Sequence, residues 1–243
     1  MTGAAPTLFL SDLHLPPQTS ALRTRFRRFL DGPARKAARV YILGDLFEAW
    51  IGDDVGMQIY AAEVAALAAL SASGVKVYFQ HGNRDFLVGE AFFDLTGVER
   101  LADPCVIDVS GRNTLLSHGD IFCTDDRPYQ RWRWFSRQRW AQWLFMRLPL
   151  SRRQKIASEL RSGSDTAKRN KPENIMDVNA RAVRLSMAQF GVTQLIHGHT
   201  HRPGTYAVDL PIGPAHRIVL PDWRDPVCDY LSAHQQGIER LPA

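Results

Sequence analysis

The chain has 243 residues, of which 45% are hydrophobic and 23% are charged, values that are ordinary for a globular domain. Its net charge of +5 and pI of about 9.3 suit an anionic partner, such as nucleic acid, an anionic membrane or a phosphorylated small molecule, although a solvated basic surface explains them equally well. Three scattered cysteines without CxxC spacing argue against a disulfide framework and favour a reducing compartment.

The first residues and the apolar runs of the chain give no sign of export or of membrane insertion. Residues 1–6 contain no basic segment of the kind that begins a signal peptide. Apolar runs stay well short of the roughly 20 residues that a membrane-spanning helix needs. We therefore expect a cytoplasmic protein.

Five short apolar stretches with β character recur along the chain, and helix-like stretches separate them. The strand-like stretches are residues 8–10, 40–43, 75–79, 114–116 and 194–196. The helix-like stretches are residues 23–30, 57–71 and 178–190. This alternation predicts an α/β fold with helices on the faces of a sheet. Two further β-like pieces, at 205–208 and 217–220, are interpreted as closing strands of a second sheet.

Each of the five strand-like stretches is followed by residues of the types that bind metal ions. In chain order these are Asp12 and His14; Asp45; Asn83, Arg84 and Asp85; His118 and Asp120; and His197, His199 and His201. Ligands of open α/β sheets bind beyond the carboxyl ends of the strands, so we expect all five groups to meet at one edge. One such group is weak evidence, whereas five in order predict a metal site.

The residue types in these groups suit two divalent cations. Asp45 is the natural bridge, because a carboxylate can offer one oxygen to each cation, and Asp12 and His14 can reach one metal from a single loop. The other donors are an amide oxygen and three imidazoles, from Asn83, His118, His199 and His201. A nitrogen and oxygen set without thiolate suits Mn, Fe, Zn or Co, and two such metals can activate water for attack on phosphorus. We interpret His197, which precedes a glycine, as structural.

Residues 127–161 interrupt the pattern with many arginines and aromatic side chains, including four of the six tryptophans. At helical spacing the aromatic residues fall on two faces, one with Tyr129, Trp132, Trp140 and Trp143 and the other with Trp134 and Phe145. This pattern predicts a helical insertion over about residues 127–172 that packs on the core with one face. The insertion is either a hairpin that caps the core or a lid for an amphiphilic ligand or membrane interface, and the two interpretations are compatible.

The ordered motifs Asp-x-His, Gly-Asp, Gly-Asn-x-Asp, His-Gly-Asp and Gly-His-Thr-His resemble the calcineurin-like metallophosphoesterase superfamily over residues 8–203. The resemblance implies a two-sheet β-sandwich flanked by helices, as a single domain of residues 1–243 with the helical lid inserted. It also implies a dinuclear centre. One metal would be held by Asp12, His14, Asp45 and His201, and the other by Asp45, Asn83, His118 and His199.

Arg84 departs from this superfamily, most members of which carry Gly-Asn-His-Asp or Gly-Asn-His-Glu at the third motif. A histidine there can protonate a leaving alkoxide, whereas arginine stays protonated near neutral pH and cannot act as a general acid. Arginine can instead clamp a phosphate and stabilise an anionic leaving group. We therefore interpret Arg84 as a sign that the leaving group is a phosphate, which indicates a pyrophosphate bond rather than an alkyl or nucleic-acid diester.

Longer stretches are similar to the UDP-2,3-diacylglucosamine diphosphatase family of lipid A synthesis. They are residues 9–15, 43–54, 81–87, 175–179 and 197–203. This resemblance implies that UDP-2,3-diacylglucosamine is cleaved into UMP and 2,3-diacylglucosamine 1-phosphate (lipid X), with two Mn²⁺ ions, at the cytoplasmic face of the inner membrane. We accordingly expect a peripheral protein on an anionic membrane and no nucleic-acid partner.

The same resemblance implies a role for individual residues. The catalytic residues would be Asp45, Asn83, Arg84 and His118. The substrate contacts would be Asn83, Arg84, Asp126, Ser164, Lys168, Lys171 and His199. Lys168 stands where the family is expected to carry a neutral polar residue, and an exposed polar loop is the alternative interpretation of residues 164–171.

Two other functions stay open at this point. The chain could be a phosphoesterase of soluble nucleotides or nucleic acid, against which Arg84 and the tryptophan-rich insertion argue. It could also be a non-catalytic scaffold with this fold, but loss of metal ligands is the usual sign of a scaffold, and the sequence keeps all seven.

Overall fold

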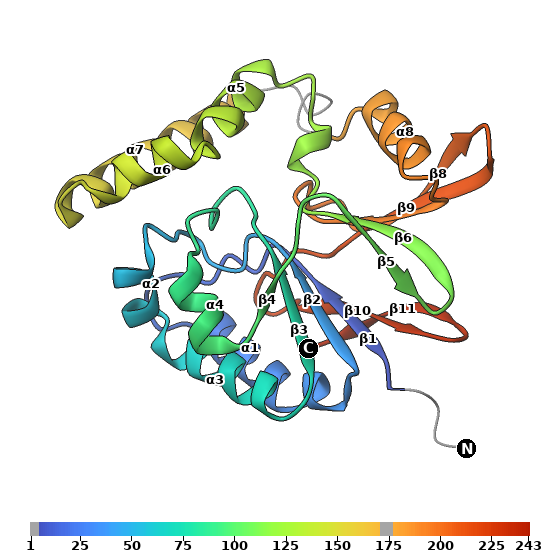
Figure 1. Ribbon diagram of the computed structural model, residues 1–243, viewed down its shortest axis with the longest axis horizontal. Helices are drawn as coiled ribbons and strands as arrows, with labels where there is room; N and C mark the ends of the chain where they lie inside the picture. Colours follow the sequence, from blue (N-terminus) through green and yellow to red (C-terminus); the bar gives the residue numbers. More distant parts are fainter. Residues whose placement is uncertain (1–4, 171–176) are drawn as a thin grey trace.

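Two β-sheets lie face to face, and helices cover the outer face of each (Figure 1). The computed structural model describes residues 5–170 and 177–243, with the backbone alone for residues 164–170. The strand order is β11-β10-β1-β2-β3-β4 in the first sheet and β5-β6-β7-β9-β8 in the second. The fold is therefore the predicted two-sheet α/β sandwich.

The first sheet is parallel from β1 to β4, and two antiparallel strands complete its other side. Its strands are β1 (Thr7–Leu10), β2 (Arg39–Leu43), β3 (Lys76–Gln80), β4 (Glu99–Arg100), β10 (Asp229–His234) and β11 (Gly237–Pro242). Successive side chains of a strand point to opposite faces. Phe9 and Tyr41 therefore face the second sheet, whereas Leu10 and Ile42 face the helices.

The second sheet has three parallel strands in its centre and an antiparallel strand on each edge. Its strands are β5 (Cys105–Val109), β6 (Arg112–Ser117), β7 (Gln194–His197), β8 (Gly204–Leu210) and β9 (Gly213–Val219). Strand β7 and the last four residues of β6 are buried, and both strands carry site residues immediately beyond their carboxyl ends.

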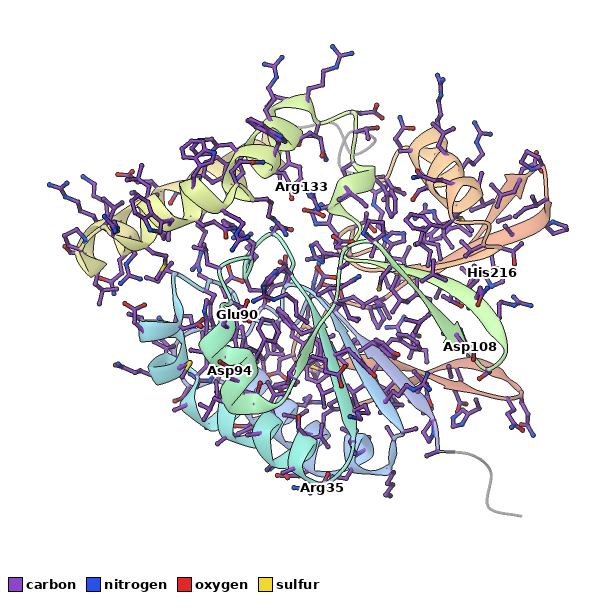
Figure 2. The ribbon with its side chains drawn as sticks, in the orientation of Figure 1. Arg35, Glu90, Asp94, Asp108, Arg133 and His216 are labelled. Atoms are coloured by element: carbon purple, nitrogen blue, oxygen red, sulfur yellow. The ribbon has the colours of Figure 1, made fainter. Side chains whose placement is uncertain are left out.

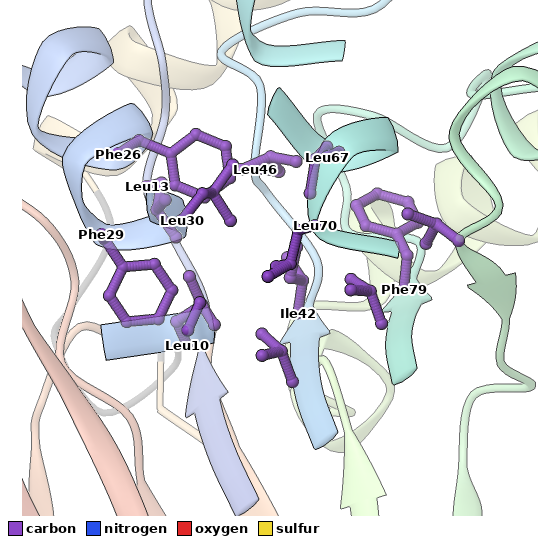
Figure 3. Packing of buried hydrophobic residues seen from close by; sticks show 14 of the residues in the cluster. Leu10, Leu13, Phe26, Phe29, Leu30, Ile42, Leu46, Leu67, Leu70 and Phe79 are labelled. Atoms are coloured by element: carbon purple, nitrogen blue, oxygen red, sulfur yellow. The ribbon is translucent and has the colours of Figure 1, made fainter. Parts of the chain in front are cut away.

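Helices α1 (Ala21–Asp31), α3 (Ala61–Ala72) and α4 (Glu90–Thr96) cover the first sheet, and α8 (Ala180–Gln189) covers the second. Figure 3 shows the largest core cluster, in which Phe26, Leu67 and Phe79 are fully buried between helices and sheet. Burial of each such side chain contributes roughly 1.5–3 kcal/mol to folding. Separate clusters fill the space between the sheets and the space under α8.

Six of the seven strands predicted from the sequence are confirmed to within about two residues, as are the helices at 23–30 and 178–190. The strand predicted at 217–220 also forms, but β9 begins four residues earlier, at Gly213. The single helix predicted at 57–71 is wrong, because α2 (Asp53–Ile59) and α3 meet at an angle of 89°. Tyr60 lies at the break, fully buried against the rings of Phe47 and Trp50, and its hydroxyl donates to the carbonyl of Leu15 over 2.9 Å. Tertiary packing therefore overrides the helix propensity of the segment.

The sequence predicted that the five groups of candidate metal ligands lie at one edge of a single sheet, and this prediction is wrong. Three of them follow β1, β2 and β3 of the first sheet, and two follow β6 and β7 of the second. The carboxyl ends of these strands from both sheets point to the same end of the sandwich (Figure 1). The site consequently lies across the seam between the two sheets.

The arginine-rich insertion forms three helices that extend above this end of the sandwich (Figure 1). They are α5 (Arg127–Ser136), α6 (Arg139–Met146) and α7 (Leu150–Asn170), and we call them the lid. The predicted sharing of one face by Tyr129, Trp132, Trp140 and Trp143 is wrong, since the chain breaks between α5 and α6. Tyr129 and Trp132 line a pocket, whereas Trp140 and Trp143 are more than half exposed.

Within residues 5–170 and 177–243, none of the helices is by itself both long enough and apolar enough to cross a bilayer. The bent pair α2 and α3 satisfies the length and composition criteria only when the two helices are taken together.

Candidate metal centre and substrate pocket

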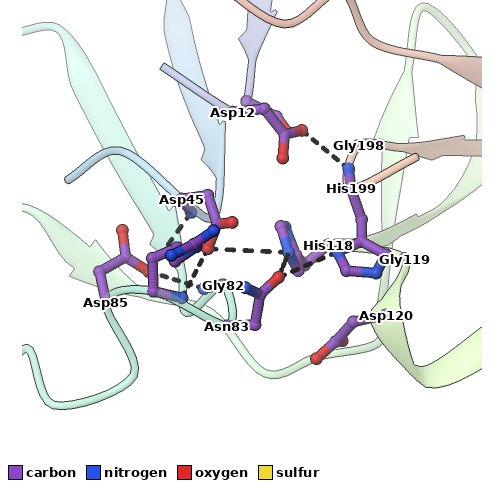
Figure 4. Close-up of polar contacts among 12 residues, drawn as sticks. Asp12, Asp45, Gly82, Asn83, Asp85, His118, Gly119, Asp120, Gly198 and His199 are labelled. Atoms are coloured by element: carbon purple, nitrogen blue, oxygen red, sulfur yellow. Dashed lines mark hydrogen bonds and ion pairs between the residues drawn. The ribbon is translucent and has the colours of Figure 1, made fainter. Parts of the chain in front are cut away.

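Seven side chains from five loops converge above the seam between the sheets. Figure 4 shows five of them, Asp12, Asp45, Asn83, His118 and His199. Among the described residues, two overlapping groups have ligand atoms that all lie within 4.8 Å of one another. The first group is Asp12, His14 and His201, and the second is Asp12, Asp45 and His118. The sequence-predicted ligands from the two sheets are therefore brought within coordination range of common points.

Asp45 belongs to the second group, and its two oxygens are directed to different histidines, one in each group. Its Oδ2 is 3.8 Å from Nε2 of His14, and its Oδ1 is 3.8 Å from Nε2 of His118. The backbone N–H of Arg84 donates to Oδ1 over 2.8 Å and holds the carboxylate in this orientation. This geometry suits a carboxylate that bridges two cations.

Each side of Asp45 has its own set of donor atoms. On one side, Nε2 of His201 lies 3.3 Å from both Nε2 of His14 and Oδ1 of Asp12. On the other, Oδ1 of Asn83 lies 3.1 Å from Nε2 of His118 and 2.9 Å from Nδ1 of His199. Nitrogen and oxygen donors that face one another in this way fit one divalent transition metal on each side.

The backbone at the site is strained in a way that a metal centre would explain. Six non-glycine residues among those described have positive φ, and five of them are candidate ligands, with φ between 46° and 70°. They are Asp12, His14, Asp45, His199 and His201. This left-handed conformation costs roughly 1–3 kcal/mol per residue and persists where the surrounding structure enforces it, often at functional sites.

Buried carboxylates create a negative field at the centre. Although burial itself opposes protonation, Asp45, Asp12 and Asp120 raise the pKa of His118 to about 9. Asp12 and Asp45 are both almost completely buried. Ionised carboxylates are rarely buried unless they are paired or coordinate a metal, so a cation at this position would neutralise charge that the fold has concentrated.

Two further carboxylates lie beside the outer nitrogen of two of the candidate metal-binding histidines. Oε2 of Glu48 lies 3.3 Å from Nδ1 of His14, and Oδ2 of Asp222 lies 3.4 Å from Nδ1 of His201. A carboxylate at the far nitrogen of an imidazole fixes the orientation of the ring and makes the ligating nitrogen more basic. Glu48 also lies 3.6 Å from NH1 of Arg84 and 3.4 Å from Nε of Arg161 in α7.

Asp85 connects two of the loops that carry metal ligands (Figure 4). It is fully buried, and its carboxylate accepts from the backbone N–H groups of Gly82 and Leu46 over 2.8 Å each, and from that of Asp45 over 3.3 Å. A Cβ atom on Gly82 would collide with the Asp45 carboxylate, so only glycine allows this close approach. These contacts fix the distance between Asp45 and Asn83.

His197 lies outside the donor cluster, as the sequence predicted. It is fully buried, its Nδ1 donates to the carbonyl of Gly198 over 2.9 Å, and its Nε2 accepts from Arg217 over 3.2 Å. Burial lowers the pKa of His197 to about 4. It therefore acts as a neutral structural residue beneath the loop of His199 and His201.

A pocket of about 900 Å³ extends from the metal-type cluster to the lid. This volume lies within the range of small-molecule sites, about 300–1,000 Å³. Asp45, Asn83 and Arg84 line its polar part. Its apolar lining comes from the loop after β2, the loop after β3 and the lid, and consists of Trp50, Ile51, Phe86, Leu87, Trp132, Phe135, Phe145, Ile156 and Leu160.

The remaining predicted substrate contacts are placed differently. Asp126 lines the pocket and caps α5, accepting from the N–H of Tyr129 over 3.2 Å. Ser164 and Lys168 lie within helix α7, and their side chains are not described. The alternative interpretation of residues 164–171 as an exposed loop is therefore wrong for residues 164–170, which are helical. Lys171 lies outside the described residues.

The sequence interpretation gave no role to Glu48, Asp85 or Tyr129. Glu48 and Asp85 stand within three residues of proposed ligands, which was the available signal, but spacing alone does not show which atoms they contact. Tyr129 was noticed only as one of several aromatic residues. Its ring stacks beside that of His199, with centroids 6.0 Å apart and an interplanar angle of 27°.

None of the three cysteines is expected to react rapidly in the native protein. Burial raises the pKa of Cys105 to about 11 and of Cys123 to about 12, and it also raises that of Cys228. The thiolate is the reactive form, so DTNB at pH 8 should label native protein slowly and label three thiols per chain after denaturation. One fast equivalent in the native protein would contradict this expectation, and its loss in Cys123→Ser would assign it to Cys123, which borders the pocket.

Comparison with known proteins agrees with this geometry. The calcineurin-like phosphoesterase family model matches residues 5–203. Proteins of Aeromonas hydrophila and Enterobacter sp. named UDP-2,3-diacylglucosamine hydrolase are each 48% identical over 217 residues, which cover 89% of this chain and 90% of the relative. The hydrolase of that name from Serratia proteamaculans is 47% identical over the same length. The chain therefore belongs to the calcineurin-like phosphoesterase family.

Proposed function

We propose that this chain hydrolyses the pyrophosphate bond of UDP-2,3-diacylglucosamine to give UMP and 2,3-diacylglucosamine 1-phosphate in lipid A biosynthesis. The observation that carries the proposal is one pocket in which a metal-binding cluster and Arg84 meet an apolar wall contributed by the lid. Relatives that share 48% identity over most of the chain bear the name of this activity.

The family and the Asp/His cluster together indicate that the protein uses a divalent metal. We further assign two cations, with Asp12, His14 and His201 on one side of Asp45 and Asn83, His118 and His199 on the other. The mixed nitrogen and oxygen donors suit Mn²⁺. When bound, such ions supply Lewis acidity and a nucleophilic water at phosphorus.

Arg84 is assigned to the leaving group. The bond that breaks joins one phosphorus to the bridging oxygen, which leaves with its electron pair on the sugar phosphate. This phosphate is a stable anion at neutral pH and needs no proton, so a permanent cation serves it better than a general acid. Arg84 lines the pocket, and Glu48 is close enough to orient its guanidinium in the absence of substrate.

The lid is assigned to the acyl chains of the substrate. Its pocket-facing side chains, such as Trp132, Phe135 and Leu160, offer an apolar surface next to the metal centre. Burial of apolar surface is worth roughly 25 cal/mol per Å², so two acyl chains add considerable affinity that a soluble nucleotide sugar cannot obtain. The assigned substrate contacts of Asp126, Ser164, Lys168 and Lys171 belong to the same part of the chain.

The proposal is tested by product analysis with defined metals. Protein treated with a chelator should not hydrolyse UDP-2,3-diacylglucosamine, and Mn²⁺ should restore equimolar UMP and lipid phosphate more effectively than Mg²⁺ or Ca²⁺. Metal titration should approach two Mn²⁺ per chain. Full activity of metal-free protein would overturn the mechanism, and saturation at one Mn²⁺ would overturn the dinuclear assignment.

We also propose that the protein works at the cytoplasmic face of the inner membrane, bound peripherally and without a nucleic-acid partner. The support lies on the outside of the lid, where Trp134, Trp140 and Trp143 are each more than half exposed. The guanidinium of Arg147 lies 3.8 Å from the ring centroid of Trp143. Tryptophan and arginine are both favoured at the interface of a membrane, and a net charge of +5 favours anionic lipid.

Flotation with vesicles tests this membrane proposal. The protein should float with phosphatidylglycerol vesicles, and replacing Trp134, Trp140 and Trp143 with serine should greatly reduce the floating fraction. Leu185→Ser in α8, where the side chain is 60% exposed, is a matched control and should float like wild type. Equal flotation of the triple variant and the control would contradict a membrane role for the lid.

A further inference from the structure

Asp120 is a buried carboxylate that the proposed mechanism does not use. It follows His118 by two residues at the end of β6, and its side chain is fully buried. Its Oδ2 accepts from the hydroxyl of Tyr129 over 2.7 Å and from Nε of Arg133 over 2.8 Å, and NH2 of Arg137 lies 3.6 Å away. All three partners belong to α5 or its C-terminal end, so this carboxylate attaches the lid to the core.

The same helix has other contacts with the loops of the metal centre. Nε2 of Gln130 donates to the backbone carbonyls of Asp120 and Cys123 over 2.8 Å and 3.1 Å. Arg137 donates through NH2 to the carbonyl of Gly82 over 2.8 Å, directly before Asn83. The α5 helix thus contacts the loops of both His118 and Asn83.

The environment of Asp120 shows that these contacts are more than a surface ion pair. Surface pairs contribute little and are easily exchanged for water. A fully buried carboxylate is tolerated only where hydrogen bonds and opposite charges compensate for its lost hydration. Here His118 and the lid arginines supply the opposite charge, while the hydrogen bonds to the carboxylate come from the lid residues Tyr129 and Arg133. Arg133 keeps about a fifth of its side chain exposed. Figure 2 shows Arg133 on the side of α5 that faces the core.

We propose that Asp120 is a positioning residue, which fixes α5 and the pocket wall made by Tyr129, Trp132 and Phe135 in register with the metal centre. This inference rests on the proposed function. Asp120 does not line the pocket, whereas the three wall residues do. Binding of an acylated substrate should therefore depend on Asp120, while hydrolysis of a small diester that needs no lid should not.

The first test compares two substrates in the Asp120→Asn variant. The amide keeps the shape and one acceptor oxygen but loses the charge that pairs with Arg133. KM for UDP-2,3-diacylglucosamine should rise about 10–100-fold, in line with the loss of a hydrogen bond to a charged group, while kcat/KM for bis(p-nitrophenyl) phosphate should stay within about 2-fold of wild type. Asp94→Asn, at an exposed position in α4 (Figure 2), should change neither. Equal losses on both substrates would overturn the inference.

A second test is independent of the lipid substrate. Hydrogen exchange of residues 127–136 should be faster in Asp120→Asn than in wild type, with Mn²⁺ content unchanged. Unchanged exchange in α5 would overturn the inference about Asp120, whatever the substrate of the protein is. Failure of the wild type to cleave UDP-2,3-diacylglucosamine would overturn the proposed function instead. If Asp120→Asn folds poorly, Arg133→Lys replaces it in this test. Lysine keeps the charge but loses the Nε donor, so exchange in α5 should increase less than a complete loss of the contact would cause.

A double-mutant cycle separates a specific attachment from general damage. The effects of Asp120→Asn and Arg133→Gln on KM should be strongly non-additive, because either change breaks the same contact. Arg153 anchors the other end of the lid, donating to the carbonyl of Ile51 over 2.7 Å and pairing with Asp54. Asp120→Asn and Arg153→Gln should therefore be additive. Additivity in the first pair would contradict the proposed role of Asp120.

Discussion

Replacing Asp45 with asparagine should reduce UMP release from UDP-2,3-diacylglucosamine by well over the 10–100-fold that loss of a supporting residue costs. The two oxygens of Asp45 face His14 and His118, which belong to opposite sides of the centre. An amide offers only one oxygen and no charge, so it cannot hold two cations together or neutralise them. The Asp45→Asn protein should also bind fewer than two Mn²⁺ ions.

The Asp45→Asn comparison needs a variant of the same chemical type at a neutral position. Asp94→Asn serves, since Asp94 is exposed on α4, and it should keep wild-type rate and metal content. Thermal unfolding of both proteins controls for misfolding, because Asp45 also accepts the backbone N–H of Arg84. UMP release by Asp45→Asn at the wild-type rate would refute the bridging role.

Replacing Arg84 with alanine should lower kcat for the same substrate about 10²–10³-fold, the effect of removing one donor that stabilises developing charge. Metal content should be unchanged, because the side chain of Arg84 is not among the proposed metal ligands. Arg84→Lys should recover only part of the loss, since lysine lacks the planar fork that binds a phosphate through two N–H groups.

An Arg84→His variant tests why the chain has arginine at this position. Histidine can donate a proton, so this variant should gain activity on diesters with alkoxide leaving groups while losing it on the pyrophosphate. The ratio of the two activities measures the preference for an anionic leaving group. Wild-type activity of Arg84→His on UDP-2,3-diacylglucosamine would contradict the role assigned to the guanidinium.

The sequence predicted the elements that carry the metal centre because strong local signals define them. Each of the five strands is a short apolar run that stops at a polar group, and β1, β2, β3, β6 and β7 all form as predicted. Strand ends need no knowledge of tertiary packing. The order of the motifs then indicated which donors meet, although the division between two sheets could not be read from strand periodicity.

What the sequence could not predict depends on contacts between distant segments. The break at Tyr60 arises because this ring packs against residues from the loop after β2. Glu48 and Asp120 both have partners in the lid. Arg161, the partner of Glu48, is 113 residues away in the sequence, whereas Arg133, the partner of Asp120, is only 13 residues away. Even the nearer pair gave no signal, because charges in an arginine-rich segment have many possible partners.

The aromatic residues of the lid show the same limit. Helical periodicity assumes one continuous helix, and the break between α5 and α6 resets the phase. Trp132 therefore lines the pocket while Trp140 faces outward with 57% exposure. The prediction of two apolar surfaces was useful, but the assignment of residues to each surface required the structure.

The most direct test of the central claim is the initial rate of UMP release by Mn²⁺-loaded protein from UDP-2,3-diacylglucosamine and from UDP-N-acetylglucosamine. Both substrates present the same pyrophosphate and uridine to the metal centre, and only the first presents acyl chains to Trp132, Phe135 and Leu160 in the pocket. We predict a much higher kcat/KM for the acylated substrate, with UMP and the lipid phosphate as products. Equal kcat/KM for the two substrates, or no UMP from the acylated one, would contradict the account.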